Sequence, residues 1–477
     1  MMFSNPLIQR YRYSLMRPRQ FWIYATIYIA IVALLLFINY TIYKYQDVFD
    51  AREDFFKSLY AQFLLFEVIV LWIWAAYNSG TALKDEVSGK TYDFFRMLPL
   101  PAHQKAVGIL LGRNLVAVLL AATNCLFLVS FGIMGKLSGV LQGQIFLVLI
   151  SVTLLVNSLI LLCSINPAKG KKKSNITAFI LLAFFAAPFF LPVMVGLSQI
   201  EEMESVRATF FNAKLPILLL ITFIVLYFSC WTIKGILRKF DREQEPLFTR
   251  KGAFLFLLGY EFVLFGLFYT HLPNAGTNIN YSYWLISLLA VLIIPFTSLR
   301  SFDKYLEHIG LAQQKYTLNT NTIFPMLSYS NLSLALGLFA MWAAVSIGVS
   351  LIAKMQLLQC LYPLFVLLSF YAFYILLLEL YVVYNQPSGK IGLLLGFVGI
   401  VYLFFPLILS AILESEIIYL YSPLGFSWSL FEKPHQRAAV ETSIQTSILV
   451  VNALFCIIPV LLVWKRYAHI PTMRRKM

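Results

Sequence analysis

Long uninterrupted runs of apolar residues are the feature that most restricts how this chain can fold. Runs such as 21–43, 115–135 and 217–236 recur along its whole length. As helices, runs of about 20 residues cross the ~30 Å of hydrocarbon in a bilayer. None alternates apolar with polar residues as the strands of a membrane barrel do. The sequence therefore predicts an all-α polytopic membrane protein, because helices satisfy their own backbone hydrogen bonds in lipid.

We count about twelve such spans along the chain. They lie near 21–43, 61–83, 115–135, 146–166, 175–197, 217–236, 254–272, 285–299, 333–353, 360–384, 391–413 and 444–464. The composition agrees, because 60% of the residues are hydrophobic and only 12% are charged. Soluble domains carry about 25% charged residues, so lipid is the main solvent of this chain.

The distribution of lysine and arginine predicts how the spans are oriented. With the N-terminus inside, the inner segments sum to a net charge of +20 and the outer segments to −2. Loops rich in Lys and Arg stay cytoplasmic. We therefore expect an inner-membrane protein with both termini in the cytoplasm. A nucleic-acid partner is not expected, because the basic residues are scattered over loops and form no single face.

The polar stretch 237–252 divides the spans into two sets of six. In each set a long inner loop follows the second span, at 84–114 and at 300–332. The sequence thus predicts two diverged six-helix halves, parallel rather than inverted because each half has an even span number. The expected segments are a cytoplasmic interfacial N-terminal segment (1–20), a first half (21–236), a linker (237–252), a second half (253–464) and a basic cytoplasmic tail (465–477).

Basic and aromatic residues intermix in the stretch 8–19, before the first span. This mixture suits a short amphipathic helix on the anionic inner leaflet, with its tyrosines at headgroup depth. It is equally consistent with a simple basic flank of the first span.

The segment between the second and third spans carries the most specific motif. In order it contains Asp85, Glu86, Gly89, Thr91, Asp93, Phe94, Leu98 and Pro99, followed by Gly108, Gly112 and Arg113. This pattern resembles the cytoplasmic loop of ATP-binding-cassette (ABC) export permeases of the type-two class. It departs from that pattern in the inserted Lys90 and in phenylalanine where leucine is usual. The start Asn5-Pro6 and the turn Ser422-Pro423 also resemble segments of these permeases.

The resemblance implies that this loop docks onto a separate cytoplasmic ATPase subunit, with two copies if both halves dock one. Thr91 or Ser88 can cap a short helix near 91–98, and Pro99 can end it. The alternative is an amphipathic helix that rests on the lipid surface. The tripeptide Gly89-Lys90-Thr91 is not itself a nucleotide site, because a P-loop needs glycine where Lys84 stands. We therefore expect no cofactor on this chain and no enzymatic activity of its own.

Three glutamates, Glu67, Glu261 and Glu379, lie within apolar spans. An ionisable residue there costs about 2.5–3.5 kcal/mol on insertion scales and marks a functional site by default. Glu67 and Glu261 are candidates for a substrate path or a proton site, or else for hydrogen bonds between helices. Glu379 is near the inner end of its span, where it can reach the interface.

Two other classes of function remain to be weighed. A secondary transporter driven by an ion gradient explains the span number and the glutamates, but gives the loop 85–101 no role. A membrane-embedded enzyme requires clustered carboxylates or histidines at one face, and the sequence shows none. No spacing of Cys or His predicts a metal site either. The exported substrate stays open among lipid, polysaccharide, peptide, drug and ion.

Overall fold

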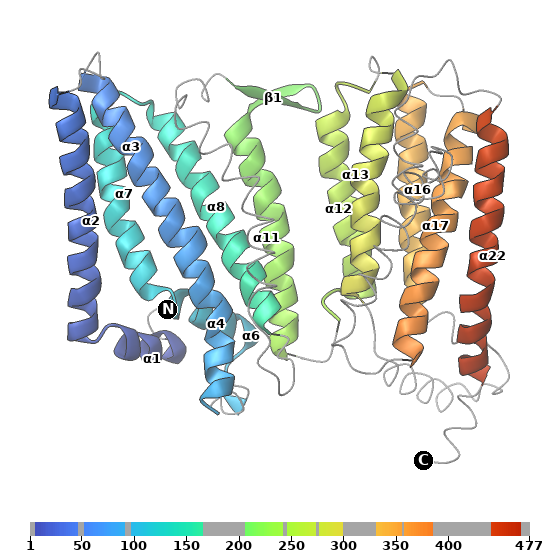
Figure 1. Cartoon of the computed structure of the whole chain (residues 1–477), viewed down its shortest axis with the longest axis horizontal. Coiled ribbons are helices and arrows are strands. Elements are labelled where there is room, and N and C mark those ends of the chain that lie inside the picture. The colour runs from blue at the N-terminus through green and yellow to red at the C-terminus, as the bar shows by residue number, and fades with distance from the viewer. Residues whose placement is uncertain are drawn as a thin grey trace, which may run out of the picture. The chain divides into compact units, whose positions relative to one another are not determined.

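The structure, a computed structural model, is almost entirely helical in the part of the chain that it describes (Figure 1). That part comprises residues 5–45, 52–90, 97–165, 206–241, 246–272, 276–298, 331–354, 357–384 and 440–468. The first elements are α1 (Pro6–Leu15), α2 (Pro18–Tyr45), α3 (Arg52–Val68), the π-helix η2 (Ile69–Trp74), α4 (Ala75–Ser88), α6 (Ala102–Gly112), α7 (Leu115–Met134) and α8 (Gly139–Ser164). The later elements are the strands β1 (Arg207–Phe210) and β2 (Ala213–Pro216), then α11 (Ile217–Asp241), α12 (Arg250–Phe268), α13 (Gly276–Thr297), α16 (Asn331–Ile352), α17 (Leu357–Tyr384) and α22 (Val440–Ala468).

Eight helices in these ranges are long and apolar enough to cross a membrane. Two shorter apolar stretches, Ser282–Pro295 and Leu364–Leu380, lie within α13 and α17. The predicted multi-pass helical class is therefore confirmed. The spans predicted at 175–197 and 391–413 lie outside the described residues, so the count of twelve stays a prediction.

The chain divides into two compact units. Unit 1 comprises residues 1–208 and 214–245, and unit 2 comprises 209–213 and 246–477. The division at residue 245 falls inside the predicted linker 237–252, although α11 continues through the first part of that stretch. Whether the units are two diverged six-helix halves stays a prediction.

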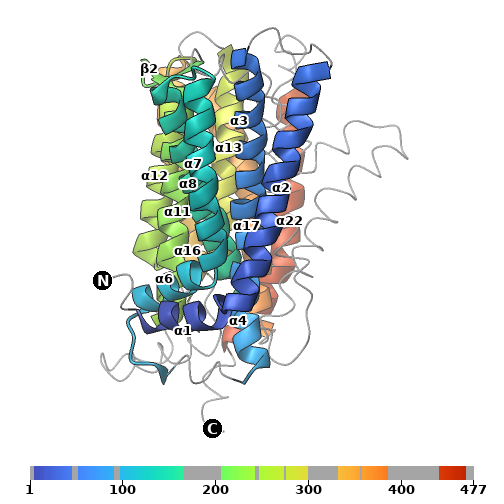
Figure 2. The same cartoon turned by 90° about the vertical axis from the view of Figure 1, so that its left-hand side faces the viewer.

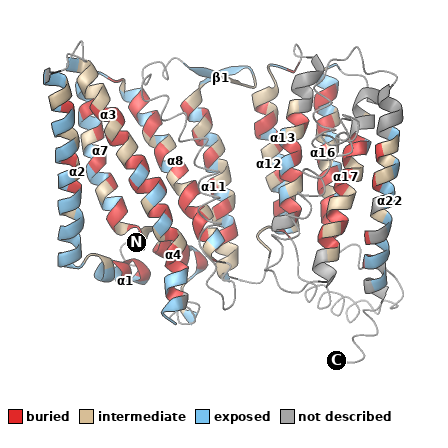
Figure 3. Ribbon diagram, viewed as in Figure 1, coloured by how far each residue is buried: buried red, intermediate tan, exposed pale blue. Residues whose placement is uncertain are grey.

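In unit 1, helices α2, α3, α7, α8 and α11 run side by side, and α1 lies across one end of them (Figures 1 and 2). The faces turned toward neighbouring helices are buried, whereas α2 is exposed along most of its length (Figure 3). Its outward side chains are large and apolar, for example Trp22, Ile29 and Phe37. Such a surface is stable against lipid and not against water, as expected of a helix at the edge of a membrane bundle.

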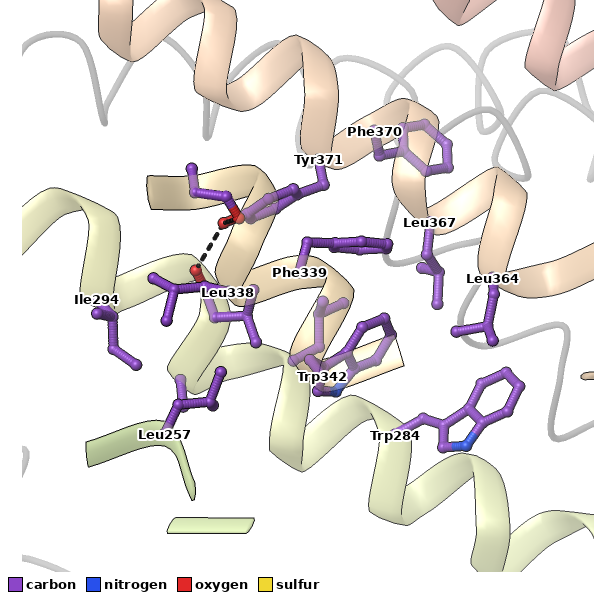
Figure 4. Close-up of a cluster of buried hydrophobic side chains, with 14 of the residues drawn as sticks. Leu257, Trp284, Ile294, Leu338, Phe339, Trp342, Leu364, Leu367, Phe370 and Tyr371 are labelled. Carbon is purple, nitrogen blue, oxygen red and sulfur yellow. Dashed lines mark hydrogen bonds between the residues drawn. The ribbon is translucent and has the colours of Figure 1, made fainter. Parts of the chain in front are cut away.

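The core of unit 2 is built around aromatic side chains from α13, α16 and α17 (Figure 4). Phe339 stacks on Tyr371 with ring centroids 4.9 Å apart, and Trp342 lies beside it. The indole N–H of Trp342 donates to the Ser287 hydroxyl at 2.7 Å. The buried Trp342 thus finds its hydrogen-bond partner on a neighbouring helix, as an apolar interior favours.

A proline inside α13 explains one of these contacts. Pro295 has no N–H to donate to the carbonyl of Val291 one turn earlier. The Tyr371 hydroxyl from α17 lies 3.3 Å from that carbonyl oxygen and 3.1 Å from the carbonyl oxygen of Ala335. One phenol therefore compensates the break in α13 and joins three helices.

A short hairpin is the one β-structure in the described residues, and the sequence did not predict it. The strands β1 and β2 meet at Phe211 and Asn212, which both have positive φ angles, 47° and 66°. The backbone N–H of Phe211 donates to the carbonyl of Gly266 on α12 at 3.0 Å. A Cβ atom at Gly266 would overlap the ring of Phe210, so only glycine lets the hairpin tip approach α12 this closely.

We predict that Tyr371→Phe lowers the free energy of unfolding by about 1 kcal/mol, because the Val291 carbonyl loses its partner in an apolar core. Denaturant titration of the protein in detergent measures this loss. Tyr40→Phe on the exposed face of α2 is the matched control and is expected to unfold like wild type. Equal stability of wild type and Tyr371→Phe would contradict the role given to this phenol.

Candidate functional site

The residues predicted to form the coupling loop lie at one end of unit 1. Asp85 and Glu86 occupy the last turn of α4, and Gly89 follows in the turn after it. Leu98 and Pro99 precede α6. Thr91, Asp93 and Phe94 lie outside the described residues, as does most of the short helix predicted at 91–98.

The end of α4 is held by charged contacts to α1 and to the end of α6. Asp85 forms an ion pair with Arg113. The buried Glu86 carboxylate lies 3.1 Å from the Arg10 guanidinium and accepts a hydrogen bond from the Tyr11 hydroxyl at 3.3 Å. The two acidic residues of the motif therefore fix the point where the loop leaves the bundle.

Tyr11 is neutral in this setting. Burial, and next the Glu86 carboxylate, raise the pKa of its phenol to about 12. Because the folded protein holds this proton more tightly than an unfolded chain does, the stability that Tyr11 contributes falls as the pH rises from 10 to 12.

Helix α1 sits directly on α6 through two glycines. The Asn5 side chain caps α1 at the Leu7 N–H (3.0 Å) and donates to the Gln104 carbonyl at 2.8 Å. A Cβ atom at Gly108 would lie 2.8 Å from the Cβ of Leu7, and one at Gly112 would lie 2.7 Å from the Tyr11 ring. The two glycines of the motif thus serve the packing of α1.

The returning arm of the loop is anchored on the same cluster. Leu98 and Leu100 pack against a buried core that includes Leu7, Ala106 and Ile109. Pro101, in an extended conformation, then precedes the first residue of α6. Both flanks of the loop are therefore tied to α1 and α6.

The loop is also joined to the middle of the bundle by one unbroken helix, because α3, η2 and α4 run continuously from Arg52 to Ser88. In the π-helical section the carbonyl of Leu71 accepts from the Asn157 side chain of α8 at 3.2 Å. The Trp72 indole donates to the Thr153 hydroxyl at 3.1 Å. Such π-helical insertions are rare and are frequent at functional sites.

Glu67 lies two residues before the π-helix and is only 1% exposed. Its carboxyl group accepts from the Asn124 amide of α7 at 2.7 Å, and the Cys125 thiol lies 3.7 Å away. Glu261, in unit 2, is 3% exposed and accepts from the Tyr283 hydroxyl at 2.5 Å. The structure therefore gives each glutamate its own buried hydrogen-bonded setting in a separate unit.

Two further observations concern polar residues inside the bundles. Glu379, for which the sequence favours hydrogen bonding between helices, is buried in α17, at 2% exposure. Ser79, Asn114 and Asn157 form a buried network in which Asn114 donates to Ser79 (2.8 Å) and Ser79 donates to Asn157 (3.0 Å). The sequence signal that could have indicated this network was asparagine inside or next to apolar spans.

No group of three or more His, Cys, Asp or Glu side chains in the described part of the chain could hold a metal ion. Comparisons with protein-family models, with curated proteins and with solved structures found no match to this chain. The interpretation of the site therefore depends on the residues and contacts described above.

We predict that Gly108→Ala displaces α1, because the new methyl group meets the Cβ of Leu7 at 2.8 Å, far inside van der Waals contact. Overpacking of this kind costs about 1–3 kcal/mol. Trypsin cleavage after Arg10 or Arg12 should then become faster in lipid nanodiscs.

The matched control is Gly143→Ala in α8, where the added methyl group meets open space. It should match wild type or be slightly more stable, because alanine favours a helix. Unchanged cleavage and stability in Gly108→Ala would show that α1 is not seated on this glycine.

Proposed function

We propose that this chain is the permease subunit of an ABC exporter, which couples ATP hydrolysis on separate cytoplasmic subunits to export of a substrate. The observation that carries the proposal is the anchored loop. Ion pairs and apolar contacts brace both flanks of residues 89–97, and the first flank is the end of the helix that continues to Arg52. The resemblance of residues 85–99 to the docking loop of type-two permeases adds to this support.

The proposed mechanism follows from that connection. An ATPase subunit binds the loop, including Thr91, Asp93 and Phe94, and moves it during its cycle. Because α3, η2 and α4 form one helix, a displacement at Ser88 is transmitted to the level of Glu67. Glu67 and Glu261 are proposed to line the substrate path. Two ATPase copies are proposed, the second at residues 300–325, which lie outside the described residues.

Orientation is part of the proposal, with both termini in the cytoplasm of an inner membrane. Lys90 and Lys136 offer a matched test, because each is an exposed turn residue. Lys90 follows the end of α4, and Lys136 follows the end of α7, at the other end of the bundle. In a cysteine-free background, we expect Lys136→Cys to react with an impermeant maleimide on intact cells. Lys90→Cys should react only after lysis, and the reverse pattern would invert the topology.

The decisive experiment tests for an ATPase partner. We expect the detergent-solubilised chain to co-purify with a Walker-motif ATPase and with ATP hydrolysis sensitive to vanadate. Asp93→Arg should remove both, because it reverses the charge at the centre of the proposed docking loop. Asp241→Arg, exposed at the end of α11, is the matched charge reversal and should keep both.

The second candidate is a carrier driven by an ion gradient, and buried Glu67 and Glu261 are the observation that favours it. If a folded wild-type chain brings down no ATPase even after cross-linking, the exporter proposal fails. Proteoliposomes that contain the chain alone then give the answer, because a carrier moves its substrate under an imposed gradient without ATP.

A further inference from the structure

The surroundings of Glu67 contain more hydrogen-bonding capacity than the protein uses. Asn124 directs its amide N–H groups at the Glu67 carboxyl (2.7 Å) and at the Phe63 carbonyl (2.9 Å). A main-chain carbonyl can only accept, so this second bond fixes the orientation of the amide. The Asn124 Oδ1 atom is fully buried and has no hydrogen-bond partner among the described residues.

Two buried phenols belong to the same cluster. The hydroxyls of Tyr28, from α2, and Tyr60, from α3, likewise have no hydrogen-bond partner in the described part of the chain. Tyr28 interacts electrostatically with both Glu67 and Cys125, and Tyr60 interacts with Cys125. The ring of Tyr28 also lies 5.8 Å from that of Phe66, the residue before Glu67. Asn124 and Tyr28 thus each place an unpartnered oxygen atom near the Glu67 carboxyl, and Tyr60 places a third near Cys125, although buried polar atoms are nearly always paired.

The charge of Glu67 is also uncompensated. An ionised carboxylate accepts about four hydrogen bonds, whereas Glu67 receives one from an amide and one weak contact from a thiol. In the described part of the chain, the groups that interact with it are Tyr28 from α2 and Asn124 and Cys125 from α7, none of them a cation. An isolated charge in an apolar interior is unstable, so a positive charge has to neutralise it.

We propose that Glu67, Asn124 and Tyr28 form a binding site for a small monovalent cation, either a proton or a sodium ion, with the Tyr60 hydroxyl near the adjoining Cys125. Carboxylate, amide and phenol oxygens are hard ligands that suit both. Close packing limits the size of the ligand. The ring centroid of Phe63 lies 5.5 Å from that of Phe127 and 5.0 Å from that of Phe131. The proposed site does not require an ATPase partner, so cation binding can be measured on the chain alone.

The test uses the full chain in nanodiscs at neutral pH, with choline as the only other cation. Infrared difference spectra of wild type against Glu67→Gln report whether the carboxyl carries a proton. Binding of radioactive sodium to the same samples reports whether the bound cation is sodium. Asp54→Asn, which removes a half-exposed carboxyl from the same helix, is the matched control and should behave as wild type.

A proton ligand gives a carboxylic-acid band that is lost in Glu67→Gln, disappears reversibly as the pH is raised, and shifts in heavy water. A sodium ligand gives saturable binding of one ion per chain that is lost in Glu67→Gln. Tyr28→Phe leaves the carboxyl intact, and it should shift the band or weaken sodium binding several-fold.

Two results would overturn the site. The first is an ionised Glu67 that binds no sodium. The second is a band that neither titrates nor exchanges while the protein stays folded, because that marks a permanently protonated structural residue. If Glu67→Gln does not fold, the Tyr28→Phe spectra decide, and spectra and sodium binding identical to wild type reject the proposed ligand set.

Discussion

Polar groups inside an apolar bundle need partners on neighbouring helices, and this requirement determines how the helices pack. Apolar surface alone does not select partners in lipid, because the lipid tails are as apolar as the side chains. Polar contacts do select them. Asn39 and Gln62 exchange two amide hydrogen bonds between α2 and α3, at 2.6 and 2.9 Å. Tyr371 compensates the carbonyl that Pro295 leaves unbonded in α13.

The same requirement ties the long helix of unit 1 to its neighbours at three levels. Glu67 bonds to α7, Leu71 bonds to α8, and Asp85 pairs with Arg113 at the end of α6. A force applied after Ser88 therefore moves a connected set of helices rather than one segment. Between Glu67 and α4 the hydrogen-bond pattern of this helix departs from the α-helix, as it often does at functional sites.

Hydropathy predicted the described spans because the length and apolarity of a helix are local properties. The π-helix was not predictable in this way, since the side chain that bonds to Leu71 is 86 residues further along the chain. Gly108 and Gly112 were recognised as a motif, but their contact with α1 depends on the tertiary fold. The hairpin at Phe211-Asn212 was missed because its turn lacks the glycine that usually marks one.

Two of the three intramembrane glutamates, Glu67 and Glu261, have different hydrogen-bonding surroundings. Glu261 receives a short bond from the Tyr283 hydroxyl, a group that donates one hydrogen, and its own Oε1 is the atom left without a partner in the described residues. Near Glu67 the unpartnered atoms belong instead to the neighbouring Asn124 and Tyr28. The cation site proposed in unit 1 therefore depends on oxygen atoms around the carboxyl, whereas Glu261 in unit 2 has a phenol donor on one oxygen and an unpartnered second oxygen.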